Sequence, residues 1–215
     1  MRTFVKFSGL KDARAVAEVP EGGAAGFLVG VPSSPRNVER DVVGRLLDAL
    51  PKDAEAWAIA VEPSVELVRE LLDTGVDRIQ VYGAMPGGLE FLEIHSLVPS
   101  LAIPRPGSGG PEPTVPPPED YARLHLDAAG DPVADASAVR PDWEICRRLV
   151  DGNPGRKLML AGALTPETVA EALEAVRPWG VDVSAGIESA PGSVDATRMR
   201  AFLASVKAYE QSTGT

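Results

Sequence analysis

Residues 180–188 read Gly-Val-Asp-Val-Ser-Ala-Gly-Ile-Glu, in which a short apolar run ends abruptly in small residues. A Val-rich run bounded by glycine is typical of a strand that is covered on both faces. Small residues such as Ser184, Ala185 and Gly186 let backbone N–H groups approach an oxyanion closely. The stretch therefore predicts a buried strand that delivers a phosphate-binding loop; the simpler alternative is a strand that ends in an ordinary glycine turn.

The same alternation of short apolar runs with helical patterns extends through the chain, and it is typical of βα units in a parallel sheet. The apolar runs predict eight strands, at residues 4–7, 25–30, 57–61, 78–82, 101–103, 123–127, 157–160 and 181–183. The segments between them predict helices at residues 11–18, 38–50, 64–75, 89–95, 142–150, 165–176 and 196–209. Eight such units in 215 residues predict one (β/α)8 barrel domain spanning residues 1–215, with its active site at the strand C-termini.

One segment interrupts the pattern. Residues 104–118 contain seven prolines, which exclude a regular helix where the fifth helix of a barrel is expected. We expect a Pro/Gly-rich loop that covers the flank of the barrel in place of that helix. The alternative is a proline motif that binds a partner protein.

Composition excludes several classes of protein. The net charge of -10 argues against a nucleic-acid surface, and a single cysteine, Cys146, excludes an internal disulfide framework. Two histidines and one cysteine make a structural zinc site improbable. No apolar run approaches the roughly 20 residues of a membrane span, and the first residues lack the apolar core of a signal peptide. We expect a soluble, cytoplasmic protein.

Candidate chemical groups lie at the predicted strand ends. The turns at residues 161–163 and 184–186 follow consecutive strands, the seventh and eighth, where barrels of this kind often bind phosphate. Asp127 ends the sixth strand between apolar walls that suit it to proton transfer; the alternatives are a helix cap or a solvated loop acid. His125 lies on the same side two residues earlier, and a hydrogen-bonded core histidine is the simpler interpretation of it.

Taken together, these motifs resemble phosphoribosylanthranilate isomerase of tryptophan biosynthesis, in order and in spacing. The resemblance covers the chain except residues 104–121. The residues that carry it are Val-Lys-Phe-Ser-Gly at 5–9, Ser-Pro-Arg at 34–36, Ile-Gln-Val-Tyr-Gly at 79–83, Leu-Asp at 126–127, Asp-Trp at 142–143, Leu-Ala-Gly-Ala-Leu at 160–164, Pro-Glu-Thr-Val at 166–169 and residues 181–188.

The resemblance implies a (β/α)8 barrel that performs an Amadori rearrangement of a phosphosugar without a cofactor or metal, as a monomer or homodimer. It implies that Asp127 is the general acid and that Arg36 holds the anthranilate carboxylate. The remaining implied substrate-binding residues are Gln80, Gly162, Ala163, Ser184, Ala185 and Gly186. A guanidinium suits a carboxylate because it can donate two parallel hydrogen bonds.

The sequence departs from the family pattern at its most reactive position. The family's first strand usually ends Lys-Ile-Cys-Gly, in which the cysteine is the general base, and here Ser8 takes that place. A hydroxyl is far too weak an acid to supply a base at neutral pH unless another base activates it. Proton abstraction is then left to Glu62, to Ser8 assisted by a neighbour, or to a water held by Ser8.

Other departures are milder. The family's Gly-Gly-x-Gly after the acid is absent at residues 128–132, its Gln-x-His-Gly is Gln-Val-Tyr-Gly at 80–83, and its second-loop Gly-Gly is Gly162-Ala163. Glu62 stands where an asparagine often follows the third strand. Two further functions therefore stay open: a phosphosugar-binding barrel with lost or trapped isomerase activity, and an isomerase for a related ribulose-phosphate substrate.

Overall fold

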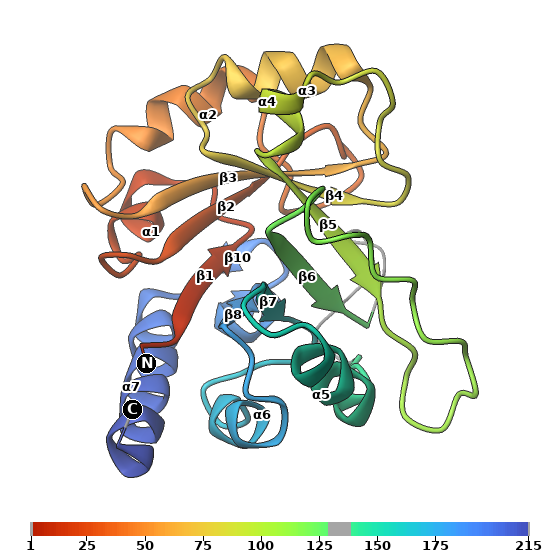
Figure 1. Cartoon of the computed structure of the whole chain (residues 1–215). Coiled ribbons are helices and arrows are strands. Elements are labelled where there is room, and N and C mark those ends of the chain that lie inside the picture. The colour runs from red at the N-terminus through yellow and green to blue at the C-terminus, as the bar shows by residue number, and fades with distance from the viewer. Residues whose placement is uncertain (1, 129–138, 215) are drawn as a thin grey trace.

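The computed structural model describes residues 2–128 and 139–214, which form a closed barrel of eight parallel strands (Figure 1). Each strand pairs with the next in chain order, and β8 pairs with β1 to close the barrel. The strands are β1 Phe4–Ser8, β2 Ala24–Leu28, β3 Glu55–Val61, β4 Arg78–Tyr82, β5 Leu97–Ala102, β6 Arg123–Asp127, β7 Lys157–Leu160 and β8 Gly180–Val183. The predicted (β/α)8 fold is confirmed.

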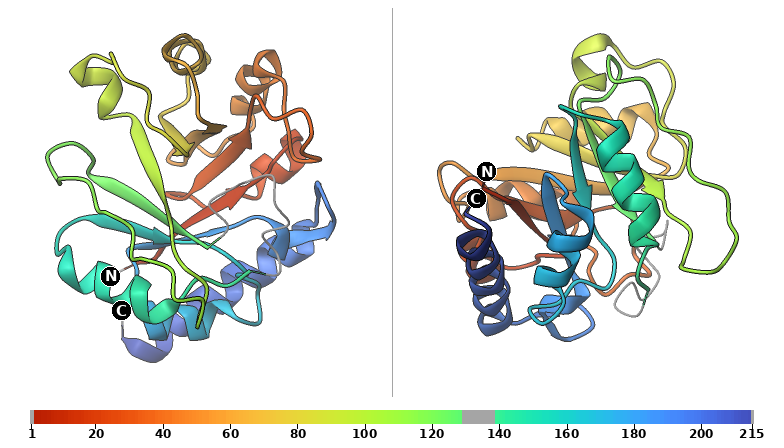
Figure 2. Two further views of the ribbon diagram at one scale, coloured as in Figure 1. Left: turned by 90° about the vertical axis from the view of Figure 1, so that its right-hand side faces the viewer. Right: turned by 60° about the horizontal axis from the view of Figure 1, so that its bottom comes forward.

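Helices cover the outside of the barrel, as the two views of Figure 2 show. They are α1 Ala13–Ala17, α2 Arg40–Leu47, α3 Val65–Leu72, α4 Phe91–Ile94, α5 Trp143–Gly152, α6 Val169–Val176 and α7 Ala196–Thr213. Their apolar faces pack on the outward-facing residues of the strands, such as Phe7 and Val81, in one continuous hydrophobic core. Ser64 caps α3 as predicted, because its side chain accepts a hydrogen bond from the Leu67 N–H.

No helix lies between β5 and β6, all of whose connecting residues are described. The Pro-rich segment runs instead as an extended loop beside α5 (Figure 1). Arg156 holds this loop by donating to the backbone oxygens of Pro116 and Tyr121, and Arg148 forms an ion pair with Glu112. The expectation that a Pro/Gly-rich loop replaces the fifth helix is thereby confirmed.

Several predicted boundaries were wrong. The fifth strand was expected at residues 101–103 but begins at Leu97, because Pro99 is accepted within the strand in register with Val81. The helix expected from residue 165 begins at Val169, since residues 165–168 form a separate turn in which the Thr168 N–H donates to the Thr165 oxygen. The helix expected from residue 38 begins at Arg40, because the Val38 N–H donates to the oxygen of Leu28 at the end of β2.

The segment between β8 and α7 was predicted as a small-residue loop, and the hairpin that it contains was not predicted. It contains the 3-10 turn η2 Ala185–Ile187 and a hairpin of β9 Glu188–Ala190 with β10 Ser193–Val194. Gly192 allows this hairpin to touch the loop after β2, since a Cβ there would lie 2.4 Å from the Pro35 backbone oxygen. The hairpin therefore brings Glu188 towards the loop that carries Arg36.

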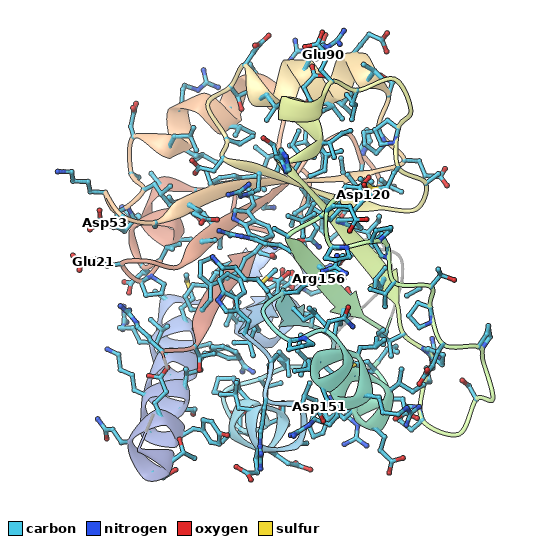
Figure 3. The ribbon with its side chains drawn as sticks, in the orientation of Figure 1. Glu21, Asp53, Glu90, Asp120, Asp151 and Arg156 are labelled. Carbon is cyan, nitrogen blue, oxygen red and sulfur yellow. The ribbon has the colours of Figure 1, made fainter. Side chains whose placement is uncertain are left out.

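Negative charge is spread over the surface of the molecule. The acidic side chains Glu21, Asp53, Glu90 and Asp151, labelled in Figure 3, are exposed. None of the helices in residues 2–128 and 139–214 has the length and apolarity that a membrane crossing requires.

Candidate functional site

A cavity opens at the C-terminal end of the barrel, and most of the predicted site residues line it. It encloses about 630 Å³, counting the part open to solvent. Its lining includes the residue that ends β1, the arginine after β2, the acid that ends β6, and residues of both small-residue turns. The lining residues are Ser8, Gly9, Leu28, Arg36, Ile59, Tyr82, Asp127, 161–164 and 182–186.

Asp127 ends β6 and is 5% exposed at the floor of this cavity. The Tyr82 hydroxyl at the end of β4 donates a hydrogen bond of 2.7 Å to Asp127 Oδ2. Burial and the nearby Asp127 carboxylate raise the pKa of Tyr82 well above its usual value, so the phenol keeps its proton. Tyr82 is thus a fixed hydrogen-bond donor to the carboxylate.

Ser8 ends β1 and is also buried, and its Oγ contacts two charged groups. Lys6 Nζ donates to Ser8 Oγ at 2.5 Å, and Ser8 Oγ donates to Asp182 Oδ1 at 2.6 Å. Gly26 on β2 makes room for this arrangement, because a Cβ there would lie 2.7 Å from Ser8 Oγ. Ser8 was predicted as a site residue from the sequence, but neither of its charged partners was.

These partners belong to a layer of buried polar groups inside the barrel, of which Asp182 also lines the cavity. Lys6 also donates to Gln80 Oε1 at 2.9 Å and to Asp182 Oδ2 at 2.8 Å. His125 Nε2 lies 3.0 Å from Asp182 Oδ2. Burial would by itself raise the pKa of Asp182, but the Lys6 charge and the His125 hydrogen bond outweigh it and hold that pKa below its ordinary value.

Two of the predicted site residues, Gln80 and Glu62, do not line the cavity. Gln80 is fully buried among these groups and does not line the cavity. Glu62 follows β3 with a φ of 43°, is exposed, and is not among the residues that line the cavity. His125 is the buried, hydrogen-bonded core histidine that the simpler interpretation described.

Arg36 lines the cavity beside the β8 loop, and its stem passes Gly9, where a Cβ would lie 3.1 Å from Arg36 Cδ. Its Nε and Nη2 each donate to the Glu188 carboxylate at 2.8 Å, a bidentate pair that the sequence analysis missed. These bonds occupy one edge of the guanidinium, and the edge formed by Nη1 and Nη2 keeps further donors.

The two small-residue turns pack directly against each other. A Cβ on Gly186 would lie 1.9 Å from the Leu164 backbone oxygen, so only glycine permits this contact. Gly162 and Ala163 have φ values of 87° and 51°, and the left-handed conformation of Ala163 explains why a second glycine suits this position. Residues of both turns line the cavity, and the β8 turn adjoins Arg36 at Gly9.

Comparison with known proteins identifies the family. A family model described as N-(5'-phosphoribosyl)anthranilate (PRA) isomerase matches residues 124–205. The N-(5'-phosphoribosyl)anthranilate isomerase of Chelativorans sp. (strain BNC1) is 32% identical over 97% of this chain and 97% of its own length. The chain belongs to the PRA isomerase family.

Solved structures of PRA isomerases share the fold. The phosphoribosyl anthranilate isomerase from Thermus thermophilus superposes with a TM-score of 0.74 at 23% identity, covering 97% of this chain and 99% of that one. Another, in complex with reduced 1-(o-carboxyphenylamino)-1-deoxyribulose 5-phosphate, gives 0.70 at 21% identity over 96% of this chain and 99% of that one. The resemblance that the motifs indicated is confirmed for the family and the fold.

Proposed function

We propose that this chain catalyses the Amadori rearrangement of PRA to 1-(o-carboxyphenylamino)-1-deoxyribulose 5-phosphate, without a cofactor. The observation that carries the proposal is that Ser8, Arg36, Asp127 and both small-residue turns line one cavity in a member of the PRA isomerase family. A single domain spanning residues 1–215 carries this site.

The first step is opening of the ribose ring, with Asp127 as the general acid. The Asp127 carboxyl donates its proton to the ring oxygen, the bond from C1 to that oxygen breaks, and the anilino nitrogen forms a double bond to C1. Tyr82 donates to the carboxylate that remains, at 2.7 Å, and so stabilises the charge left by proton transfer. Asp127 is largely buried but lines the cavity, so its carboxyl can contact a bound substrate.

The second step is removal of the proton from C2, which converts the imine into an enolamine. Ser8 Oγ is the group at the family's base position, and it lies in the same cavity as Asp127. Protonation at C1 and conversion of the C2 hydroxyl to a ketone then complete the isomerisation. Every atom of the substrate is retained.

Charge complementarity supports the orientation of the substrate. The outer edge of the Arg36 guanidinium holds the anthranilate carboxylate, while Glu188 fixes the plane of the group. Backbone N–H groups of the turns at Gly162-Ala163 and 184–186 receive the phosphate, because two small-residue turns in contact make a concave site of donors. Gln80 acts one layer below, by holding Lys6.

Two further assignments are part of the proposal. We place the enzyme in the cytoplasm, because its phosphorylated substrate is charged and does not cross membranes. We also assign it to tryptophan biosynthesis, as a monomer or homodimer. Cell fractionation and the mass measured by light scattering test these assignments.

The direct test is consumption of freshly prepared PRA by the purified chain, followed by loss of anthranilate-type fluorescence. We expect catalytic turnover and a ketose product identified by NMR, since the isomer has the same mass as the substrate. Binding of the reduced product analogue without turnover would instead establish a phosphosugar-binding barrel. Turnover only of another ribose-phosphate amine would establish a related isomerase.

A further inference from the structure

Ser8 alone does not explain how the C2 proton is removed. A serine hydroxyl takes a proton from carbon at neutral pH only if a second group accepts the hydroxyl's own proton. We infer that Asp182 is this group, and that Ser8 Oγ relays the C2 proton of the substrate to Asp182 Oδ1. The inference rests on the proposed isomerase function and names the base that the family's cysteine would otherwise supply.

The direction of the hydrogen bonds around Ser8 follows from Lys6. An ammonium has three donors and no acceptor. Lys6 Nζ lies 2.5 Å from Ser8 Oγ, 2.9 Å from Gln80 Oε1 and 2.8 Å from Asp182 Oδ2, so each of its hydrogens has an acceptor. Because Ser8 Oγ accepts from Lys6, its own hydrogen points to Asp182 Oδ1 at 2.6 Å, a distance typical of a hydroxyl bound to a carboxylate.

The neighbours of His125 determine which hydrogen bonds the other oxygen of Asp182, Oδ2, accepts. Gln80 presents its oxygen to Lys6 and therefore its amide nitrogen to His125 Nδ1, at 3.2 Å. His125 Nδ1 is then an acceptor, so Nε2 carries the hydrogen and donates to Asp182 Oδ2 at 3.0 Å. Oδ2 thus holds the donors from Lys6 and His125, which lower the pKa of Asp182 and keep it ionised, while Oδ1 faces Ser8 and holds the proton only until it is returned at C1.

Lys6 is the competing acceptor, because burial lowers its pKa, although the Asp182 carboxylate opposes that shift. If Lys6 were neutral and accepted the Ser8 hydrogen, Ser8 Oγ and Asp182 Oδ1 would be two oxygens 2.6 Å apart with no hydrogen between them. That contact is repulsive. The observed distance therefore favours Asp182 as the acceptor and Lys6 as a fixed positive charge.

The relay balances. The C2–H bond breaks and its proton passes to Ser8 Oγ, while the Ser8 O–H proton passes to Asp182 Oδ1. The electron pair of the C2–H bond forms the C1–C2 double bond, and the imine electron pair returns to nitrogen. Lys6 keeps Ser8 and Gln80 as acceptors when Asp182 is neutral, and reversal of the relay returns the proton at C1.

The test is a cycle of Asp182→Asn and Ser8→Cys, with kcat measured for PRA. An asparagine can keep its oxygen towards Lys6 and His125 while its amide faces Ser8, which removes only the acceptor. We expect Asp182→Asn to lower kcat by about 10²–10⁴ when residue 8 is serine. In the Ser8→Cys background the thiol ionises on its own, and we expect Asp182→Asn to lower kcat by less than about tenfold. Asp77→Asn, which changes an exposed carboxylate on another part of the barrel, serves as the control for the substitution itself.

Equal losses in both backgrounds would overturn the relay, because a merely structural Asp182 is needed whichever group stands at position 8. If Asp182→Asn does not fold, Ser8→Ala decides, since the relay requires a loss of about 10²–10⁴ in kcat and full activity would refute it. A parent chain without turnover would refute the proposed function instead.

Discussion

The ion pair between Arg36 and Glu188 is predicted to contribute strongly to stability. Both side chains are nearly buried, at 8% and 4% exposed, and two hydrogen bonds of 2.8 Å join them. Removing one partner of a buried pair costs about 3–5 kcal/mol because a charge is left uncompensated. Glu188→Gln keeps one acceptor oxygen, and Arg36 adjoins the open cavity, so we expect a loss of about 2–3 kcal/mol.

For a chain of this length, 1 kcal/mol corresponds to about 2–4 °C in Tm, so the expected decrease is about 4–12 °C. Thermal and urea unfolding followed by circular dichroism measure it. Glu70→Gln is the matched control: Glu70 pairs with Arg40 on the surface, both about half exposed, and such a pair contributes no more than about 1 kcal/mol. A Glu188→Gln variant whose Tm falls no further than that of Glu70→Gln would refute the reasoning.

Three other predictions concern Gly186, Glu62 and Cys146. Gly186→Ala places a Cβ 1.9 Å from the Leu164 oxygen, so we expect a loss of about 1–3 kcal/mol and a raised KM for PRA, whereas Gly152→Ala, with no atom within 4 Å, destabilises nothing. Glu62→Gln is expected to change kcat less than threefold because Glu62 is exposed outside the cavity lining; a hundredfold loss would make it the base. Burial raises the pKa of Cys146 to about 12, so about one thiol in 10⁴ is ionised at pH 8 and alkylation should require unfolding; rapid labelling of the native chain would contradict this.

The strands could be predicted from the sequence because a parallel barrel strand is buried on both faces and reads as a short apolar run. β4, β6 and β7 were placed with their observed ends. The predicted β5 was too short, because Pro99 lacks the N–H that a strand normally uses. The hairpin after β8 was missed, because residues 188–194 carry no apolar run.

The polar layer beneath the cavity was harder to predict, because its members come from strands far apart in the sequence. Lys6 and Asp182 are 176 residues apart and meet only when β8 closes on β1. A signal was present, since side chains alternate in a strand. The inward positions two residues before Ser8, Tyr82, Asp127 and Ser184 are all polar, namely Lys6, Gln80, His125 and Asp182.

The Glu188 partner of Arg36 was not predictable in the same way. It depends on how the hairpin after β8 folds back over the loop that follows β2, and neither segment has a regular period. The sequence indicated the arginine from its motif, and only the structure showed which carboxylate fixes it.

We propose that this barrel is an isomerase with Asp127 as its general acid, and the kcat of Asp127→Asn beside that of the parent tests this proposal most directly. The amide keeps the shape and the Tyr82 contact but cannot donate a proton, so we expect kcat to fall by about 10²–10⁴ while the Kd for the reduced product analogue stays within a few-fold. Unchanged turnover in Asp127→Asn, or no turnover in the parent chain, would contradict the account.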